Sequence, residues 1–251
     1  MGRYDGILIC SDFDATLFVR GKLSDENAEA IKYFQANGGL FTLVSGRHPE
    51  HFKQYYDLIR PNTYIMGLNG GAIYDPDTEK RVYWGRLPEE AYSRALAMLD
   101  KYDRLDHIHI HREYDWFPIT RENRGEVEVD PAAISKIIFY VQRENSDYMK
   151  ATLKGEFESD KYALERSWAN GIELLSVNDT KGAGIRRMRA LLGDRVHTVI
   201  GVGDYENDVT MIKEADIGYA VENACDELKA VADRITVHCE NHAIAKIISE
   251  L

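Results

Sequence analysis

Two aspartates, Asp12 and Asp14, stand at the end of an apolar run that begins at Ile7. Because side chains alternate along an extended chain, positions 12 and 14 point to the same side. Two carboxylates at such a short distance repel each other, so the pair needs a cation or a shared proton. This spacing predicts a metal site that includes a carboxylate able to act as a nucleophile.

Three further polar clusters occur later in the chain. They are Ser45-Gly46-Arg47, Lys181-Gly182, and Asp204 with Asn207 and Asp208, while Thr16 belongs with the first pair of aspartates. Each cluster follows a predicted strand or begins a predicted helix. Since open α/β sheets bind ligands at the carboxyl ends of their strands, we expect all four clusters to lie at one sheet edge.

The combined residue types predict a phosphoryl-transfer site. A divalent cation between Asp12, Asp14 and Asp204 would neutralise both the nucleophile and a phosphate group. Ligands that are all hard oxygen atoms favour Mg²⁺. Lys181 would add a positive charge beside the phosphoryl oxygens, and Ser45 with the backbone N–H groups of the Gly46 loop would donate hydrogen bonds to them.

The two aspartates take different roles in this scheme. Asp12 could attack phosphorus and form an aspartyl-phosphate, which water then hydrolyses. Asp14 is placed to protonate the leaving oxygen and afterwards to deprotonate that water. Each cluster alone also fits ordinary turn, capping or surface chemistry, and their conjunction on one sheet edge is what favours catalysis.

The elements that must position these clusters follow from apolar runs and turn residues. After the first strand we expect a helix at Ser24–Asn37, a strand at Leu40–Val44, a helix at Pro49–Ile59 and a strand at Tyr64–Gly67. Alternation of strands and helices is typical of a parallel sheet with right-handed crossovers.

From about residue 80 the pattern changes to helices with paired strands, and alternation resumes with a helix at Lys181–Leu192. The prediction is an α/β fold with a Rossmann-like three-layer core and a mostly parallel sheet, at 1–79 and 179–251. An inserted α+β domain at 80–178 interrupts that core.

Composition limits the partners. A formal charge of −11 argues against nucleic acid or an anionic membrane surface as the main partner. The three cysteines show neither metal-ligand spacing nor an even disulfide framework, which suits a reducing compartment. We see no signal peptide and no apolar run of the ~20 residues that span a bilayer, so we expect a cytoplasmic protein acting on a small phosphorylated metabolite.

The motifs, in this order, resemble those of the haloacid dehalogenase superfamily of phosphatases, and of its Cof-type, sugar-phosphatase-like branch with a large cap. The matching segments are Asp12-Phe13-Asp14-Ala15-Thr16-Leu17, Val44-Ser45-Gly46-Arg47, Lys181-Gly182, Gly203-Asp204-Tyr205-Glu206-Asn207-Asp208 and Asn69-Gly70-Gly71. The resemblance implies a Mg²⁺-dependent phosphatase, with a sugar phosphate as the favoured substrate. It also implies that the inserted α+β domain at 80–178 is a cap domain that sets substrate specificity.

The resemblance also implies residue roles. Asp12 would be the nucleophile and Asp14 the acid/base, and Mg²⁺ would be held by Asp12, Asp204 and the backbone carbonyl of Asp14. Phosphate would be bound by Ser45, Gly46, Lys181 and Asn207, with Thr16 and Asp208 in support. Two segments depart from the family pattern: Ala15 stands where glycine is usual, and Asn241-His242-Ala243 replaces an Asp-Gly-Val type of segment.

Three histidines in the expected cap, His107, His109 and His111, alternate with isoleucines and should share one face of a strand. One interpretation is a half-exposed strand whose isoleucines pack inside the cap. The sharper hypothesis is that the histidines line the roof over the active site and contribute to substrate specificity.

Two other functions stay open from the sequence. A phosphomutase or phosphotransferase of the same fold would pass the phosphoryl group to a second substrate and would need basic residues to hold a second phosphate. A non-catalytic binding relative is the third reading, and the presence of every catalytic residue type argues against it.

Overall fold

The computed structural model describes residues 2–251, and these residues form two compact units. The core unit consists of the segment that ends at Tyr83 and the segment that begins at Lys181, and the inserted unit is Trp84–Thr180. The sequence analysis placed the insertion at 80–178. Each unit is described by itself, and the functions assigned to them from the sequence stay predictions.

The core unit is built on a five-stranded parallel sheet with strand order β15-β14-β13-β1-β4. Its strands are β1 Ile7–Ser11, β4 Leu40–Leu43, β13 Thr198–Gly203, β14 Ile217–Ala220 and β15 Arg234–Ile235. The first strand of the chain lies between β13 and β4, so both of its edges are hydrogen-bonded inside the sheet. This central place explains its buried, uninterrupted apolar sequence.

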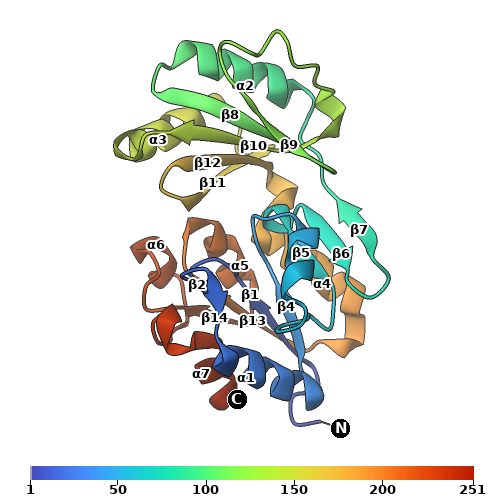
Figure 1. The fold of residues 1–251 in the computed structure, drawn as a ribbon. Coiled ribbons are helices and arrows are strands. Elements are labelled where there is room, and N and C mark those ends of the chain that lie inside the picture. The colour runs from blue at the N-terminus through green and yellow to red at the C-terminus, as the bar shows by residue number, and fades with distance from the viewer. Residues whose placement is uncertain (1) are drawn as a thin grey trace. The chain divides into compact units, whose positions relative to one another are not determined.

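Helices cover both faces of this sheet, which makes three layers (Figure 1). Along β1 the side chains alternate: Ile9 packs in one apolar cluster with residues of α1 and α7, whereas Leu8 and Cys10 pack in another with residues of α4. The helices are α1 Asp25–Ala36, α4 Lys181–Leu192, α5 Val209–Glu214, α6 Asp226–Lys229 and α7 Ala243–Ser249. The predicted α/β class with a parallel, three-layer core is confirmed.

The inserted unit is an antiparallel five-stranded sheet, in the order β11-β12-β10-β8-β9, with two helices. Helices α2 and α3 lie along one face of the sheet (Figure 1) and share its apolar cluster. The elements are α2 Glu90–Lys101, β8 Leu105–Arg112, β9 Trp116–Ile119, β10 Ile134–Val141, α3 Ser146–Glu156, β11 Tyr162–Trp168 and β12 Gly171–Ser176. The predicted α+β character of this unit is confirmed.

Two small sheets complete the core unit. They contain the hairpin β2 Phe18–Val19 and β3 Lys22–Leu23, and the sheet β5 Ile65–Gly67, β6 Ala72–Asp75 and β7 Lys80–Trp84. Short 3₁₀ helices join the elements at Pro49–Tyr55 (η1), Leu68–Gly70 (η2), Pro131–Ala133 (η3), Arg143–Asn145 (η4), Val177–Asp179 (η5), Gly193–Arg195 (η6), Glu206–Asp208 (η7) and Cys239–Asn241 (η8).

Three features of the structure differ from the sequence-based predictions. The helix expected at Pro49–Ile59 is the 3₁₀ helix η1, where Phe52 and Tyr55 at i, i+3 both pack on Phe13. The strand β5, expected in the parallel sheet, pairs antiparallel with β6, and a single bridge between Val44 and Met66 joins it to β4. The chain reverses after β5 because the residues of η2 take positive φ angles.

The third difference is the β2–β3 hairpin, which the sequence analysis did not predict. Arg20 and Gly21 both have positive φ, 50° and 82°, as the tight primed turns of two-residue hairpins require. An arginine at the first turn position is not a typical signal for such a turn, and each strand has only two residues.

The two departures from the family's glycine positions both occupy left-handed backbone. Ala15 and His242 each have φ of 58°, a conformation that glycine adopts without the strain a Cβ introduces. Neighbouring contacts hold the first of them in place, since the Ala15 N–H donates to the Phe18 carbonyl and Asn223 donates to the Ala15 carbonyl. The chain therefore keeps the turn geometry without the glycine.

Among residues 2–251 there is no helix that is both long enough and apolar enough to cross a membrane.

Candidate active site

Asp12 directly follows the central strand β1. Its backbone N–H donates to the Val202 carbonyl of β13 (2.8 Å), and Ser11 Oγ donates to its carbonyl (2.7 Å). The side chain is 8% exposed, so a carboxylate is held at the carboxyl edge of the sheet and largely out of water. The fixed backbone on both sides leaves this carboxylate little freedom to move.

Lys181, the first residue of α4, reaches the same place. Its ammonium group is fully buried and donates to Asp12 Oδ1 and to Asp208 Oδ1, both at 2.6 Å. Gly182 lets this helix approach α5, because a Cβ there would lie 2.4 Å from the Thr210 carbonyl oxygen. A glycine after the lysine is thus required by packing.

Asp208 organises the loop after β13. Besides Lys181 it binds two backbone groups: its Oδ2 accepts the N–H of Asp204 (3.0 Å) and of Tyr205 (3.1 Å). Gly203 makes room for it, since a Cβ there would meet the Asp208 carboxyl carbon at 2.4 Å. The Gly-Asp-X-X-Asn-Asp pattern therefore describes a loop folded around its own last carboxylate.

Three carboxylates, those of Asp12, Asp204 and Asp208, each offer an oxygen atom within 4.8 Å of the others. Thr16 fixes the carboxylate of Asp204 by donating a hydrogen bond from its hydroxyl to Asp204 Oδ1 (3.1 Å). Only one cation, Lys181, touches this group in the hydrogen bonds described above, so the negative charge is in excess. An all-oxygen donor set with excess negative charge fits a hard divalent cation.

The pKa values reflect this excess. Burial raises the pKa of Asp12 well above its usual range, and although Lys181 opposes the shift, Asp208 and Asp204 add to it. Burial, followed by the nearby Asp208, raises the pKa of Asp204 to about 7. Burial alone would lower the pKa of Lys181, but the charges of Asp12 and Asp208 outweigh it and raise that pKa. A metal ion would relieve the repulsion that these shifts express.

Asp14 lies in a different environment from Asp12. Its carboxylate accepts two hydrogen bonds from Arg47, one to each oxygen and both 2.7 Å long, and it is about half exposed. Arg47 in turn contacts His51 Nε2 at 3.0 Å. The side chain of Asp14 is therefore outside the three-carboxylate group, and the predicted use of its backbone carbonyl as a ligand stays a prediction.

The predicted phosphate-binding residues come from three loops. Ser45 Oγ accepts the N–H of Arg47 (3.2 Å), so it caps the turn in which Gly46 lies. Asn207 is buried and donates its side-chain amide to Asn69 Oδ1 (3.2 Å). These contacts hold the groups in place at the ends of β4 and β13, and their roles toward phosphate stay predictions.

Sequence reasoning left two residues of this edge without a role, Arg47 and Asn69. In the structure Arg47 donates to the carboxylate of Asp14. Asn69, which is fully buried with a φ of 58°, accepts a hydrogen bond from the side-chain amide of Asn207. Both belong to segments that the motif analysis identified. Arg47 lies two positions after Ser45 and Asn69 lies after a predicted strand, and these positions were the signals in the sequence for a role at this edge.

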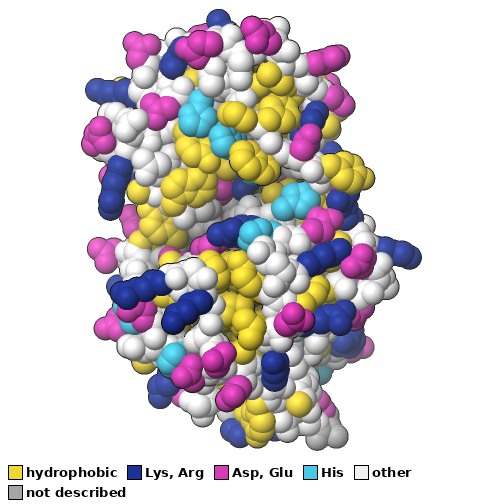
Figure 2. Space-filling view, viewed as in Figure 1, with side chains coloured by type: hydrophobic (Ala, Val, Ile, Leu, Met, Phe, Trp, Pro, Cys, Tyr) yellow, Lys and Arg dark blue, Asp and Glu magenta, His cyan; other side chains and the backbone are white. Residues whose placement is uncertain are grey.

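The three cap histidines lie on β8 of the inserted unit, and the structure brings two of them together. His107 Nε2 and His109 Nε2 are 3.2 Å apart, and His111 stacks more loosely on Trp116, with ring centroids 6.3 Å apart. Figure 2 shows imidazole side chains among hydrophobic ones on this unit. Their predicted place over the active site stays a prediction.

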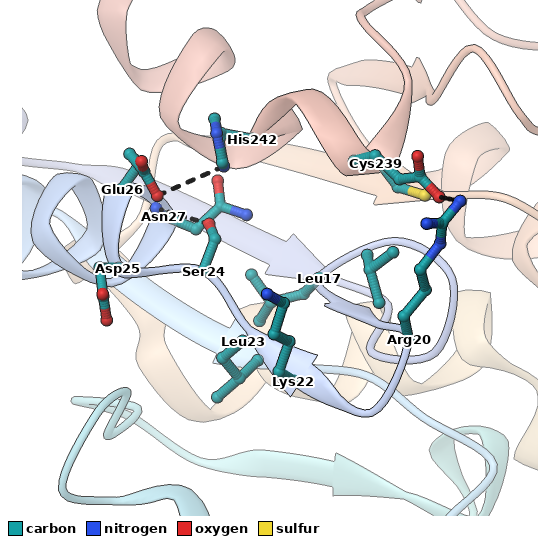
Figure 3. Close-up of a pocket in the computed structure, with 12 residues that line it drawn as sticks. Leu17, Arg20, Lys22, Leu23, Ser24, Asp25, Glu26, Asn27, Cys239 and His242 are labelled. Atoms are coloured by element: carbon teal, nitrogen blue, oxygen red, sulfur yellow. Dashed lines mark hydrogen bonds and ion pairs between the residues drawn. The ribbon is translucent and has the colours of Figure 1, made fainter.

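A separate groove of about 460 Å³ is lined by residues of β2, β3, the start of α1 and η8 (Figure 3). Residues of its lining are linked by an ion pair between Arg20 and Glu240 (2.7 Å) and by a contact between His242 Nδ1 and the Glu26 carboxylate (3.6 Å). Its lining residues differ from those of the carboxylate group. We therefore locate the candidate active site by its donor atoms and not by this groove.

The sequence matches the model of the haloacid dehalogenase-like hydrolase family over residues 9–248, so the chain belongs to that family. The resemblance inferred from the motifs is confirmed, including its Cof-type branch, and so is the class of enzyme, a hydrolase.

Similar proteins cover nearly the whole chain. Two from Bacillus subtilis (strain 168) are named 5-amino-6-(5-phospho-D-ribitylamino)uracil phosphatases: YitU is 25% identical over 97% of this chain and 96% of its own, and YcsE is 26% identical over 96% and 94%. A HAD/COF-like hydrolase from Plasmodium vivax has the same fold, with a TM-score of 0.82, 20% identity and coverage of 99% and 96%.

Proposed function

We propose that this protein is a Mg²⁺-dependent phosphatase that hydrolyses a small phosphorylated metabolite of the sugar-phosphate class through an aspartyl-phosphate on Asp12. The observation that carries the proposal is the buried carboxylate of Asp12, which shares Lys181 with Asp208 and lies beside Asp204. The family and the phosphatase names of the relatives support it.

Each residue of the site has its own role. Asp12, Asp204 and the backbone carbonyl of Asp14 hold the metal, which when bound lowers the repulsion between a carboxylate and an incoming phosphate. Lys181, Ser45, the Gly46 N–H and Asn207 bind the phosphoryl oxygens. Asp208 and Thr16 position Lys181 and Asp204 through the hydrogen bonds described above.

Asp14 moves the proton in this scheme. Its carboxylate starts in the ion pair with Arg47, about half exposed, and it must leave that pair to reach the leaving oxygen. It takes up a proton from solvent, gives that proton to the leaving oxygen, and then, as a carboxylate again, takes one from the attacking water. Arg47 therefore holds the carboxylate of Asp14 before the proton transfer.

The test is phosphate release from a panel of sugar phosphates, with and without Mg²⁺. Asp12→Asn should lower the rate by about 10⁴-fold, because it removes the nucleophile and leaves the rest of the site in place. Asp57→Asn, at an exposed carboxylate in the core unit, is the matched control and should keep full activity. Full activity of Asp12→Asn would remove the nucleophile assignment.

Transfer to a second substrate is the alternative within the same fold. It predicts a bisphosphorylated intermediate, whereas hydrolysis predicts one inorganic phosphate for each substrate consumed. We also propose that the protein is cytoplasmic and that its partner is a small phosphorylated metabolite. We propose no nucleic acid or membrane partner. All three cysteines are free thiols, which agrees with a reducing compartment.

A further inference from the structure

The inserted sheet has one face packed on helices and another that carries histidines. Along β8, Ile108 and Ile110 are fully buried in the apolar cluster shared with α2 and α3, so His107 and His109 belong to the opposite face. Both imidazoles are partly exposed to solvent. A dissolved ion can therefore reach them without disturbing the apolar cluster.

The spacing of these two imidazoles fits a shared metal ion. The Nε2 atoms of His107 and His109 are 3.2 Å apart. Two imidazole nitrogens that each lie about 2.0–2.1 Å from one tetrahedral Zn²⁺ are separated by about 3.3 Å. The two nitrogens therefore already have the separation of neighbouring ligands on one ion, although they belong to a single strand.

Stacked rings hold both imidazoles in place. His107 stacks on Tyr140, with ring centroids 4.4 Å apart and 12° between the planes, and His109 stacks on Trp116 at 5.3 Å and 19°. Tyr140 also contacts His109, with centroids 4.4 Å apart. Contacts that fix the orientation of metal ligands before the ion arrives lower the entropy cost of binding it.

The two imidazoles can offer lone pairs near neutral pH. Burial lowers the pKa of His107, and burial together with the neighbouring His107 lowers the pKa of His109 to about 4, so both rings are neutral. In the free protein one Nε2–H donates to the other Nε2. When a metal binds, the donor ring carries its proton on Nδ1 instead, so both Nε2 atoms become ligands and no proton is lost.

The ligand atoms also select the kind of ion. Neutral imidazole suits Zn²⁺, Cu²⁺ and Ni²⁺, whereas Mg²⁺ and Ca²⁺ take oxygen ligands. The carboxylate group of the core unit, formed by Asp12, Asp204 and Asp208, offers only oxygen atoms. The histidine pair of β8 offers only nitrogen atoms, so the two places should bind different metals.

We propose that His107 and His109 bind one late first-row divalent metal ion, such as Zn²⁺, through their Nε2 atoms, with water completing the coordination. The site lies wholly within the inserted unit and does not depend on the phosphatase function proposed above. With two protein ligands, half of the binding free energy of a four-ligand structural zinc site corresponds to a Kd of roughly 1–200 µM. The ion is therefore exchangeable.

The first test follows the imidazole Cε1–H signals in NMR spectra of the full chain while ZnCl₂ is added at pH 7.5 with excess Mg²⁺. The signals of His107 and His109, assigned by their loss in the glutamine variants, should shift together and saturate with a Kd in that range. Mg²⁺ alone should leave them unchanged. If neither signal moves up to about 1 mM Zn²⁺, the contact is an ordinary hydrogen bond and the proposal is wrong.

The second test measures the affinity of variants by isothermal titration calorimetry. His107→Gln and His109→Gln should each raise the Kd for this Zn²⁺ at least about ten-fold, because each removes one of two ligands. The matched control is His111→Gln, on the same strand, which should change the Kd by less than about two-fold. An equal loss in all three variants, or no loss in the first two, overturns the two-histidine site.

A contact in the core unit provides the competing location. His238 Nδ1 and Cys239 Sγ are 3.7 Å apart, and imidazole and thiolate also bind Zn²⁺. Binding that is kept in His107→Gln and lost in His238→Gln would place the ion there and contradict the proposal. Cooperative thermal melts of every variant without Zn²⁺ would show that a lost affinity reflects a lost ligand and not unfolding.

Discussion

Each unit of the protein buries a lysine in contact with carboxylates, and the two sites differ in their balance of charge. In the core unit Lys181 binds both Asp12 and Asp208, and Asp204 lies within reach of the same group. In the inserted unit Lys136 faces Glu173 at 2.8 Å, and Ser167 donates to the second oxygen of that glutamate.

The comparison separates a site built to bind from a pair that stabilises a structure. Three carboxylates against one ammonium leave an excess of negative charge that a divalent cation can neutralise. The direct contact of one carboxylate with one ammonium is a balanced pair that joins β10 to β12, and the buried Glu165 lies opposite Glu173 in the register of β11 with β12. Burial of charge alone is therefore a poor sign of function, whereas three carboxylates within reach of one another and of a single cation are a better one.

The largest effect on stability should come from breaking the balanced pair. Lys136→Met leaves Glu173 buried without its cation and should lower the free energy of unfolding by about 3–5 kcal/mol. The double variant Lys136→Met/Glu173→Leu removes both charges and should recover most of that loss. Chemical denaturation measures both, and a double variant as unstable as the single one would contradict a purely structural pair.

The unbalanced site should respond to metal and to removal of one carboxylate. Mg²⁺ at about 100 times its Kd should add about 2.7 kcal/mol of stability to the wild type, seen as a higher Tm that EDTA reverses. Asp204→Asn should lose most of this gain. Without metal the same variant should be more stable than the wild type, by about 1 kcal/mol, because it removes repulsion with Asp12 and Asp208.

In Asp204→Asn the stability without metal should rise, and the stabilisation by Mg²⁺ should fall. A metal-free Asp204→Asn that is less stable than the wild type would show that the three carboxylates are not in conflict. An undiminished Mg²⁺ effect in that variant would place the metal elsewhere.

The smallest effect concerns the neutral imidazoles of the inserted unit. Because the folded-state pKa of His109, about 4, lies below its ordinary value of 6.5, the unfolded chain binds more protons between those values. Stability from this residue should therefore be complete above pH 6.5 and fall as the pH drops toward 4. Since His109 is partly exposed to solvent, we expect a loss of about 1 kcal/mol.

His109→Gln isolates this contribution. The difference in unfolding free energy between wild type and variant should be larger at pH 7.5 than at pH 5, since carboxylates that titrate in both proteins cancel. A difference that does not change with pH would mean that His109 is not held neutral by the fold.

Much of the fold could be predicted because the signals are local. The helix at Lys181–Leu192 was predicted at its observed bounds, and Ser24 caps α1 as expected, accepting the Asn27 N–H at 3.1 Å. The errors lie where backbone conformation depends on distant partners. The 3₁₀ form of η1 depends on packing against Phe13, and the antiparallel pairing of β5 depends on the reversal through Leu68, Asn69 and Gly70.

By itself the sequence determined which groups are present at the catalytic edge: Asp12, Asp14, Ser45, Lys181 and Asp204 each follow a strand or begin a helix, and periodicity places such residues. Only the tertiary structure decided how those groups pair. Lys181 pairs with Asp208 as well as with Asp12, while Arg47 pairs with the side chain of Asp14. Contacts of about 2.6 Å between residues far apart in the chain depend on sheet register and on turns such as the one at Ala15, and a linear pattern does not encode those geometries.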